Sequence, residues 1–348
     1  MARKKLKIKS FIALVALLLV ITLMIPSLLV LPFSGDEATK KLGEELNKEN
    51  NLQIKTIETS SGPTVEVAVF RMQKKQVETL PLEKYVIGVV ASEMPRDFEK
   101  EALKAQALTA RTYIINQMLK EKKADLPEGA LVTDTENHQV YKSDEELKNI
   151  FGVDYKWAIN KITEAINETS GQIITYKGAP IEASFFSTSN GFTENSEEIW
   201  MKAVPYLKSV ESPWDLQSPK FTGQKIMPIK EFEQKLGVHL SNSSTIGKVT
   251  ERTVGKRVGK VEINGKVVSG KDVREKLGLK STDFTWELKG DKIIIQTKGN
   301  GHGVGMSQYG ANGMAAEGKT YKEIIHYYYT GVEITSSDPF LTRIVARK

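Results

Sequence analysis

A long apolar run near the start of the chain constrains the fold most. It covers residues 11–33 and is interrupted only by Thr22, Ser27 and two prolines. These 23 residues would form roughly 34 Å of helix at about 1.5 Å per residue, enough to cross a bilayer. Five cationic residues precede the run and predict a cytoplasmic N-terminus: Arg3, Lys4, Lys5, Lys7 and Lys9. The sequence therefore predicts a single-pass protein of the cell membrane whose remaining residues form an extracytoplasmic domain.

A cleaved signal peptide is the alternative interpretation of this run. The apolar core of a signal peptide usually has about 7–15 residues and is followed by small residues at the cleavage site. The run here is longer, and no A-x-A pattern follows it. An uncleaved anchor is therefore favoured, and no second apolar segment of that length follows in the sequence.

The composition is that of a folded soluble domain, with 40% hydrophobic and 26% charged residues. The absence of cysteine excludes disulfides, thiolate metal sites and cysteine nucleophiles. The formal net charge is +6, but without the five N-terminal cations the rest of the chain carries only about +1. We therefore expect no nucleic-acid partner.

Helix and strand patterns follow one another without strict alternation after residue 63, which favours an α+β fold. The sequence indicates strands near residues 64–70 and 292–297 and long helices near residues 100–120 and 155–169. The expected organisation is a cytoplasmic tail (1–10), an anchor (11–33), a linker (34–62), a catalytic core in two parts (63–220 and 291–335), an inserted subdomain (221–290) and a C-terminal tail (336–348).

Glu93 is the first candidate for a catalytic group. An apolar stripe with helical spacing precedes it on the same face: Leu82, Tyr85, Val86, Val89 and Val90. Pro95 predicts that the helix ends near Glu93, where both burial and the negative end of the helix dipole favour a neutral carboxyl group. A neutral acid near pH 7 suits general acid catalysis. The alternative is a glutamate paired with a neighbouring Lys or Arg.

Two other segments offer polar groups for a ligand. On the alanine-rich helix near residues 100–120, Lys104 and Arg111 are seven positions apart on one face, with Gln106 between them. Such a face could orient an anionic sugar, or it could simply be solvated. The second segment, residues 187–191, is rich in short hydroxyls and either binds sugar hydroxyls or forms an ordinary turn. Its candidate binding residues are Ser187, Ser189 and Asn190.

A glycine-rich loop at residues 299–308 is the strongest of these motifs. Its alternating glycines let the backbone approach a ligand closely, and His302 lies among them. The sequence contains no P-loop and no clear dinucleotide-binding unit, and its four histidines show neither helical ligand spacing nor an HExxH motif. We therefore expect a substrate-binding loop without metal or cofactor, and its candidate residues are His302, Gly303, Ser307 and Gln308.

Four motifs in order carry a resemblance to a known family: VVASEMP, EALKAQALTARTY, FFSTSNGFTE and GHGVGMSQYGANGMA. Together they span roughly residues 64–335, and the chain resembles the family of stage II sporulation protein D. The resemblance implies a lytic transglycosylase that cleaves peptidoglycan glycan strands during forespore engulfment, with Glu93 as catalytic acid. It implies a substrate stripped of stem peptides, and sporulation amidase P and membrane protein M as partners. Some relatives hold zinc with histidines and cysteines, but this chain has His138 and no cysteine.

The residues fit that chemistry. A hydrolytic glycosidase usually needs two carboxylates, whereas a lytic transglycosylase can work with one, and the sequence singles out one. Two alternatives remain open. The related domain also occurs in amidase enhancers, so the chain could be a non-catalytic activator or a glycan-binding scaffold. It could also be a muramidase whose second carboxylate is Glu182 or Glu194.

Overall fold

The computed structural model describes residues 53–57, 63–120, 126–240 and 245–347. The predicted tail (1–10), the predicted anchor (11–33) and most of the predicted linker lie outside these residues. Within the described ranges, no helix combines the length and the apolar character that a membrane crossing requires. The chain divides into two compact units, Met1–Ile54 and Lys55–Lys348, and every helix and strand below belongs to the second.

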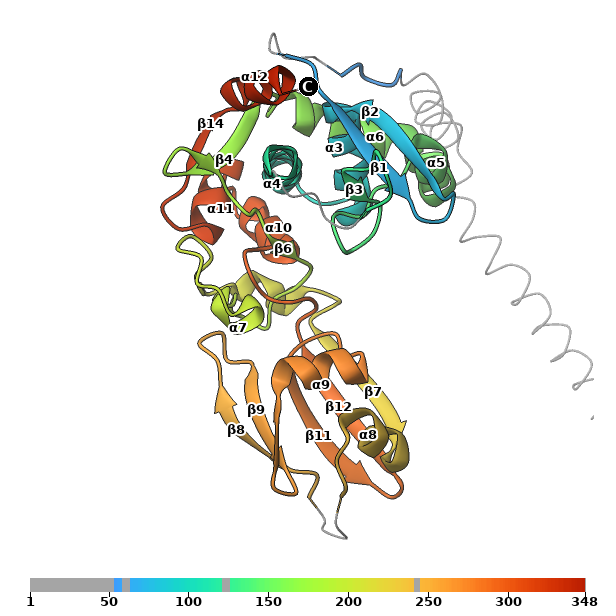
Figure 1. Ribbon diagram of the computed structural model, residues 1–348, viewed down its shortest axis with the longest axis vertical. Helices are drawn as coiled ribbons and strands as arrows, with labels where there is room; N and C mark the ends of the chain where they lie inside the picture. Colours follow the sequence, from blue (N-terminus) through green and yellow to red (C-terminus); the bar gives the residue numbers. More distant parts are fainter. Residues whose placement is uncertain (1–52, 58–62, 121–125, 241–244, 348) are drawn as a thin grey trace, which may run out of the picture. The chain divides into compact units, whose positions relative to one another are not determined.

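The first part of this unit is built around helix α4 (Lys100–Leu119), which Figure 1 shows end-on. Four alanines on α4 are fully buried: Ala102, Ala105, Ala107 and Ala110. Their small side chains allow close packing on several sides of the helix. The helices in contact with α4 are α3 (Leu82–Glu93), α6 (Tyr155–Asn167), α10 (Gln308–Ala316), α11 (Tyr321–Tyr328) and α12 (Asp338–Ala346).

Three small sheets lie around these helices. The first has the order β2-β1-β3 and consists of β1 (Glu66–Arg71), β2 (Gln76–Pro81) and β3 (Val132–Thr133). The second has the order β14-β4-β5 and consists of β4 (Gln172–Tyr176), β5 (Ala179–Pro180) and β14 (Glu333–Ser336). The third is the parallel pair β6 (Phe185–Phe186) and β13 (Met306–Ser307). Short helical segments complete this part: α5 (Asp144–Phe151), η2 (Gly152–Asp154), α7 (Glu197–Trp200) and η3 (Pro213–Gln217).

The second part of the unit has a hydrophobic cluster of its own. Two antiparallel sheets with the orders β10-β9-β8 and β11-β12-β7 contribute to this cluster, together with α8 and α9. The elements are β7 (Thr222–Pro228), α8 (Ile229–Leu236), β8 (Lys248–Arg252), β9 (Val258–Ile263), β10 (Lys266–Ser269), α9 (Gly270–Leu277), β11 (Asp283–Lys289) and β12 (Lys292–Lys298).

The mixture of helices and small sheets confirms the predicted α+β class. One boundary needs adjustment, because β12 pairs with both β11 and β7 and buries Ile293 and Ile295 in the second cluster. The sequence pattern had assigned these residues to the second half of the core. We therefore propose residues 221–298 as the inserted subdomain.

A buried arginine fixes the segment between β3 and α5. The Arg71 side chain on β1 is only 2% exposed and forms ion pairs with Glu78, Asp134 and Glu146. Its guanidinium also lies over the Tyr141 ring, 4.9 Å from the centroid. These contacts hold residues 134–146 next to α3, where the candidate site lies.

Candidate active site

A cleft of about 550 Å³ brings together side chains from distant parts of the sequence. Four of the sequence-predicted residues line it: Glu93, Ser187, His302 and Gln308. The second part of the unit contributes Arg274, at the end of α9, and Lys280, in the loop after it.

Glu93 is the last residue of α3, as Pro95 led us to expect. Its Oε1 accepts a hydrogen bond from the Val140 N–H at 2.9 Å, and its backbone carbonyl accepts one from the Gln308 amide at 3.1 Å. Burial raises the pKa of the Glu93 carboxyl above 4.5, and the nearby Glu136 carboxylate adds to this effect, whereas the Val140 N–H lowers the pKa. The arrangement favours an acid that keeps its proton to a higher pH than an ordinary glutamate.

A glycine on α3 explains how Val140 reaches Glu93. A Cβ atom on Gly88 would lie 2.3 Å from Cε2 of Tyr141, so only glycine leaves room for this segment. The two residues that flank Val140 both contact Tyr85 of α3. The Tyr85 ring stacks on the Tyr141 ring with centroids 5.7 Å apart, and the Tyr85 hydroxyl donates to the Gln139 side-chain oxygen at 3.1 Å. The backbone at residues 139–141 therefore lies directly against the helix that carries the acid.

His302 lies half-buried beside two aromatic rings, with its centroid 5.7 Å from that of Phe186 and 5.6 Å from that of Trp200. Its Nδ1 accepts the Val304 N–H at 3.1 Å, which leaves the proton of a neutral ring on Nε2. Burial, helped by the positive charge of Arg274, lowers the pKa of His302 to about 4. At neutral pH this imidazole is therefore an uncharged hydrogen-bonding group.

Gly303 does not face the cleft, in contrast to the sequence-based expectation. Its φ is +91°, and an added Cβ would lie 2.6 Å from the Arg257 guanidinium carbon. Arg257 is buried and donates to the Phe192 carbonyl at 3.0 Å. The missing side chain of Gly303 thus makes room for a buried arginine, and Gly303 is not a substrate-binding residue in this arrangement.

The three candidates on α4 also lie away from the cleft. Arg111 is completely buried, donates to both carboxylate oxygens of Glu83 at 2.8 Å and contacts backbone carbonyls near the end of α6. Lys104 pairs with Glu168, and Gln106 is fully buried. The expectation of a basic face was wrong because neighbouring helices cover α4 on several sides.

Ser189 and Ser307 are buried around a single carboxylate rather than exposed to a ligand. Asp215 accepts hydrogen bonds from the Ser189 hydroxyl at 2.8 Å and from the Ser307 hydroxyl at 2.6 Å. Asn190 donates its amide to the Gly255 carbonyl and to Asp283, both at 3.0 Å. These three predicted binding residues therefore hold loops together, because their short side chains satisfy buried partners within the protein.

The sequence reasoning missed three charged residues of the cleft: Glu136, Arg274 and Lys280. Glu136 is an exposed carboxylate whose charge acts on Glu93, so the cleft contains a second acid. The only sequence feature that could have pointed to Glu136 as a site residue is that His138 lies two positions after it. Arg274 is part of the charged stretch REK on α9, which is typical of a solvated helix face.

The two carboxylates considered for a muramidase lie elsewhere. Glu194 is fully buried and accepts hydrogen bonds from the Thr253 hydroxyl and the Gly255 N–H. Glu182 lines a neighbouring hollow and lies 3.4 Å from the Lys120 ammonium. Glu136, which lines the same cleft as Glu93, is therefore the better candidate for a second catalytic carboxylate.

The neighbouring hollow extends the cleft. It measures about 600 Å³ and shares Tyr113, His138 and Ser184 with the cleft. Trp200 and Tyr206 also line it, and aromatic side chains offer broad apolar faces with polar edges. The shared residues show that the two hollows adjoin each other.

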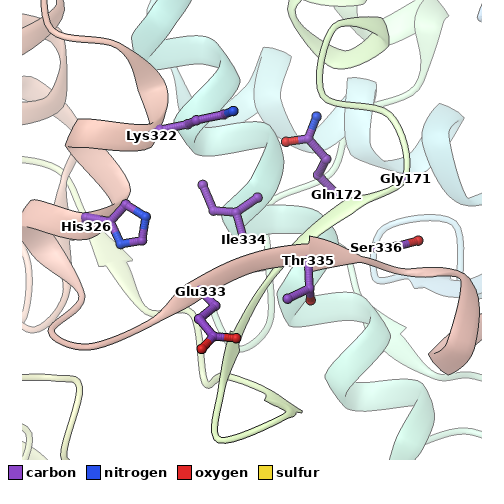
Figure 2. A pocket seen from close by; sticks show the side chains of 8 residues that line it. All are labelled: Gly171, Gln172, Lys322, His326, Glu333, Ile334, Thr335 and Ser336. Atoms are coloured by element: carbon purple, nitrogen blue, oxygen red, sulfur yellow. The ribbon is translucent and has the colours of Figure 1, made fainter.

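A further hollow and His138 offer no second candidate for an active site. Figure 2 shows a separate hollow between α11 and β14, lined by Lys322, His326 and Glu333, and none of the predicted site residues lies there. His138 uses its Nδ1 to contact the Thr133 hydroxyl at 2.9 Å. The described ranges hold no group of three or more potential metal ligands.

Comparisons with known proteins place the chain in a family. A family model described as "Stage II sporulation protein" matches residues 71–176. Stage II sporulation protein D of Bacillus subtilis (strain 168) is 50% identical over 345 residues, covering 98% of this chain and 100% of that protein. The protein of the same name from Bacillus amyloliquefaciens is 49% identical over 348 residues, with the same coverage.

A more distant relative carries a different name. The "Amidase enhancer" of Bacillus subtilis (strain 168) is 29% identical over 303 residues, covering 72% of this chain and 40% of the enhancer. The near-complete match to the sporulation proteins confirms the resemblance seen in the four sequence motifs. This chain belongs to the stage II sporulation protein D family.

Proposed function

We propose that this chain is a lytic transglycosylase that cleaves peptidoglycan glycan strands during forespore engulfment. In this proposal, residues 11–33 anchor it in the cell membrane with the cleft on the extracytoplasmic side. Its substrate is glycan without stem peptides, and sporulation amidase P and membrane protein M are its partners. The observation that carries the proposal is the Glu93 carboxyl group, which lines the cleft and has a raised pKa.

The chemistry requires Glu93 to act twice. As an acid, it gives its proton to the oxygen of the bond between N-acetylmuramic acid and N-acetylglucosamine, and the C1–O bond breaks. As a carboxylate, it then accepts the proton of the muramic acid C6 hydroxyl while O6 bonds to C1. The products are a 1,6-anhydromuramic acid end and a new hydroxyl on the leaving sugar, and Glu93 regains its proton. No water molecule is consumed.

The environment of Glu93 supports both steps. Burial favours the protonated acid before the reaction, and the Val140 N–H stabilises the carboxylate formed when the proton leaves. The Gln308 amide holds the backbone carbonyl of the same residue. Two adjoining hollows offer more than one place for the sugars of a polymeric substrate.

The test is the mass of the products formed by the purified full-length chain on stripped glycan strands. Transglycosylation gives anhydro ends, whereas hydrolysis gives products heavier by one water. We expect anhydro products from the wild type, and a loss of about a hundredfold or more in turnover for Glu93→Gln, the usual scale for general acid–base catalysis. Cleavage by Glu93→Gln within a few-fold of the wild type would contradict the role of Glu93.

Glu136 gives a specific reason to consider a muramidase, because it is a second carboxylate in the same cleft. Glu136→Gln distinguishes the two reactions, since a muramidase that depends on Glu136 would lose activity as severely as Glu93→Gln. The transglycosylase needs one acid and should keep most of its activity. A non-catalytic amidase activator, suggested by the name of the distant relative, would yield no new glycan ends, with or without an added amidase, because an amidase cuts only the bond to the stem peptide.

A further inference from the structure

Arg274 is a charged group that the proposed mechanism does not use. It lines the same cleft as Glu93 but belongs to α9, in the second part of the unit. Its Nε is buried and has no hydrogen-bond partner, and its side chain has no ion pair or hydrogen bond with any residue of the described ranges. The side chain as a whole is only half-buried, but a donor atom that is buried without a partner costs free energy. This side chain therefore lacks a partner of opposite charge.

The surroundings of Arg274 favour an anionic ligand. The cationic Lys280 lines the cleft as well. The carboxylates of Glu275 and Glu136 act on Arg274 through space, but neither forms an ion pair with it. The planar donors of a guanidinium match a carboxylate, which can accept two parallel hydrogen bonds.

We propose that Arg274 binds the lactyl carboxylate of an N-acetylmuramic acid residue in the cleft and is the specificity residue for stripped glycan strands. This inference rests on the proposed function, because it takes a muramyl glycan as the ligand. In an intact strand the lactyl carboxyl group is joined to the stem peptide as an uncharged amide. Once the stem is removed, the free carboxylate offers a negative charge and two acceptor oxygens to Arg274.

The experiment compares two probes with the same sugar skeleton. One is a stripped muramyl oligosaccharide with free lactyl carboxylates, and the other carries methylamides in their place. Binding is measured with the full-length chain carrying Glu93→Gln, so that the probe is preserved. Arg274→Gln, added to this chain, should weaken binding of the acid probe by about ten- to a hundredfold, the usual scale for a charge-assisted pair. Binding of the methylamide probe should change by less than about twofold.

The matched control is Lys276→Gln, which removes an exposed cation from the same helix outside the cleft. It should leave the affinity for both probes unchanged. Arg274→Lys keeps the charge but loses the planar donors, so it should restore only part of the affinity for the acid probe. The midpoint of thermal unfolding should not fall in Arg274→Gln, because the replacement removes a buried donor that has no partner.

Salt provides a test that needs no Arg274 variant. Raising NaCl from about 50 to 500 mM should weaken binding of the acid probe much more than that of the methylamide probe, because screening acts on the ion pair. Equal effects of Arg274→Gln on both probes, or no effect on either, would overturn the inference. That result leaves the proposed function intact if Glu93→Gln still abolishes cleavage. Cleavage that survives Glu93→Gln would overturn the proposed function, while the binding data would still report on Arg274.

Discussion

Glu93 experiences two opposing effects, and their balance sets its protonation state. Loss of water favours the neutral acid, whereas the Val140 N–H favours the carboxylate. Burial is the larger effect, so the pKa is raised. The Gln308 amide also lowers the pKa, so the carboxylate is less costly here than in a completely apolar site.

The raised pKa predicts how folding stability depends on pH. Glu93 of the unfolded chain titrates near 4.5, whereas in the folded chain it titrates higher. Between these two pKa values the folded chain binds more protons than the unfolded chain, so the contribution of Glu93 to stability decreases as pH rises. Glu93→Gln does not titrate. Its unfolding midpoint, measured by circular dichroism from pH 4 to 8, should therefore increase relative to the wild type as pH rises. A difference independent of pH would contradict this.

At the level of elements, the contact between α3 and residues 139–141 shapes the acid site. The helix contributes the carboxyl group, and the neighbouring backbone contributes its hydrogen-bond donor. Gly88 permits this contact, and the Arg71 ion pairs hold the adjoining segment in place. The acid is therefore positioned by packing on both sides of residues 134–146.

Gly88→Ala tests this contact, because helix propensity and the contact predict opposite changes in the free energy of unfolding. Helix propensity alone predicts that replacing a glycine inside a helix by alanine stabilises the protein by about 1 kcal/mol. The new Cβ would overlap the Tyr141 ring, and overpacking of this kind typically costs about 1–3 kcal/mol. We expect a lower free energy of unfolding in urea, together with lower cleavage activity because the Val140 N–H moves away from Glu93. A stabilised variant would show that Tyr141 moves aside without penalty.

At the scale of the whole unit, the cleft is lined by residues from both parts, each of which has its own hydrophobic cluster. Glu93 lies on α3, which packs against α4, whereas Arg274 lies on α9, which contributes to the second cluster. Under the proposed function, substrate recognition would require both parts to be folded, although each part has its own buried core.

Phe232→Ala should weaken the second cluster selectively. Phe232 is fully buried and packs edge-on against Trp286, with centroids 5.5 Å apart, and such truncations cost about 3–5 kcal/mol. Hydrogen exchange should therefore become faster in β11 and β12, with little change in α4. The control is Ile226→Ala, which removes an exposed side chain from β7 of the same sheet. Equal acceleration in α4 would show that both clusters unfold as one cooperative unit.

The sequence predicted those features of the fold and the site that are determined by residues close together in the chain. The apolar stripe and Pro95 located Glu93 at a helix end, and the helix predicted near residues 100–120 is α4. The roles of Arg111 and Ser189 could not be predicted, because Glu83 and Asp215 meet them only through the tertiary fold. Arg274 and Glu136 looked like ordinary surface charges for the same reason. The glycine-rich loop was recognised from the sequence, but the close approach of Arg257 to Gly303 could not be predicted.

The contact between Gln308 and the Glu93 carbonyl joins residues 215 positions apart. It therefore cannot form until synthesis has passed residue 308. A nascent or prematurely terminated chain that ends before residue 299 would contain the acid but lack the glycine loop and His302 beside it. If the proposed activity is correct, only molecules that extend past this loop could cut the wall. The order of assembly would then protect the cell from its own unfinished product.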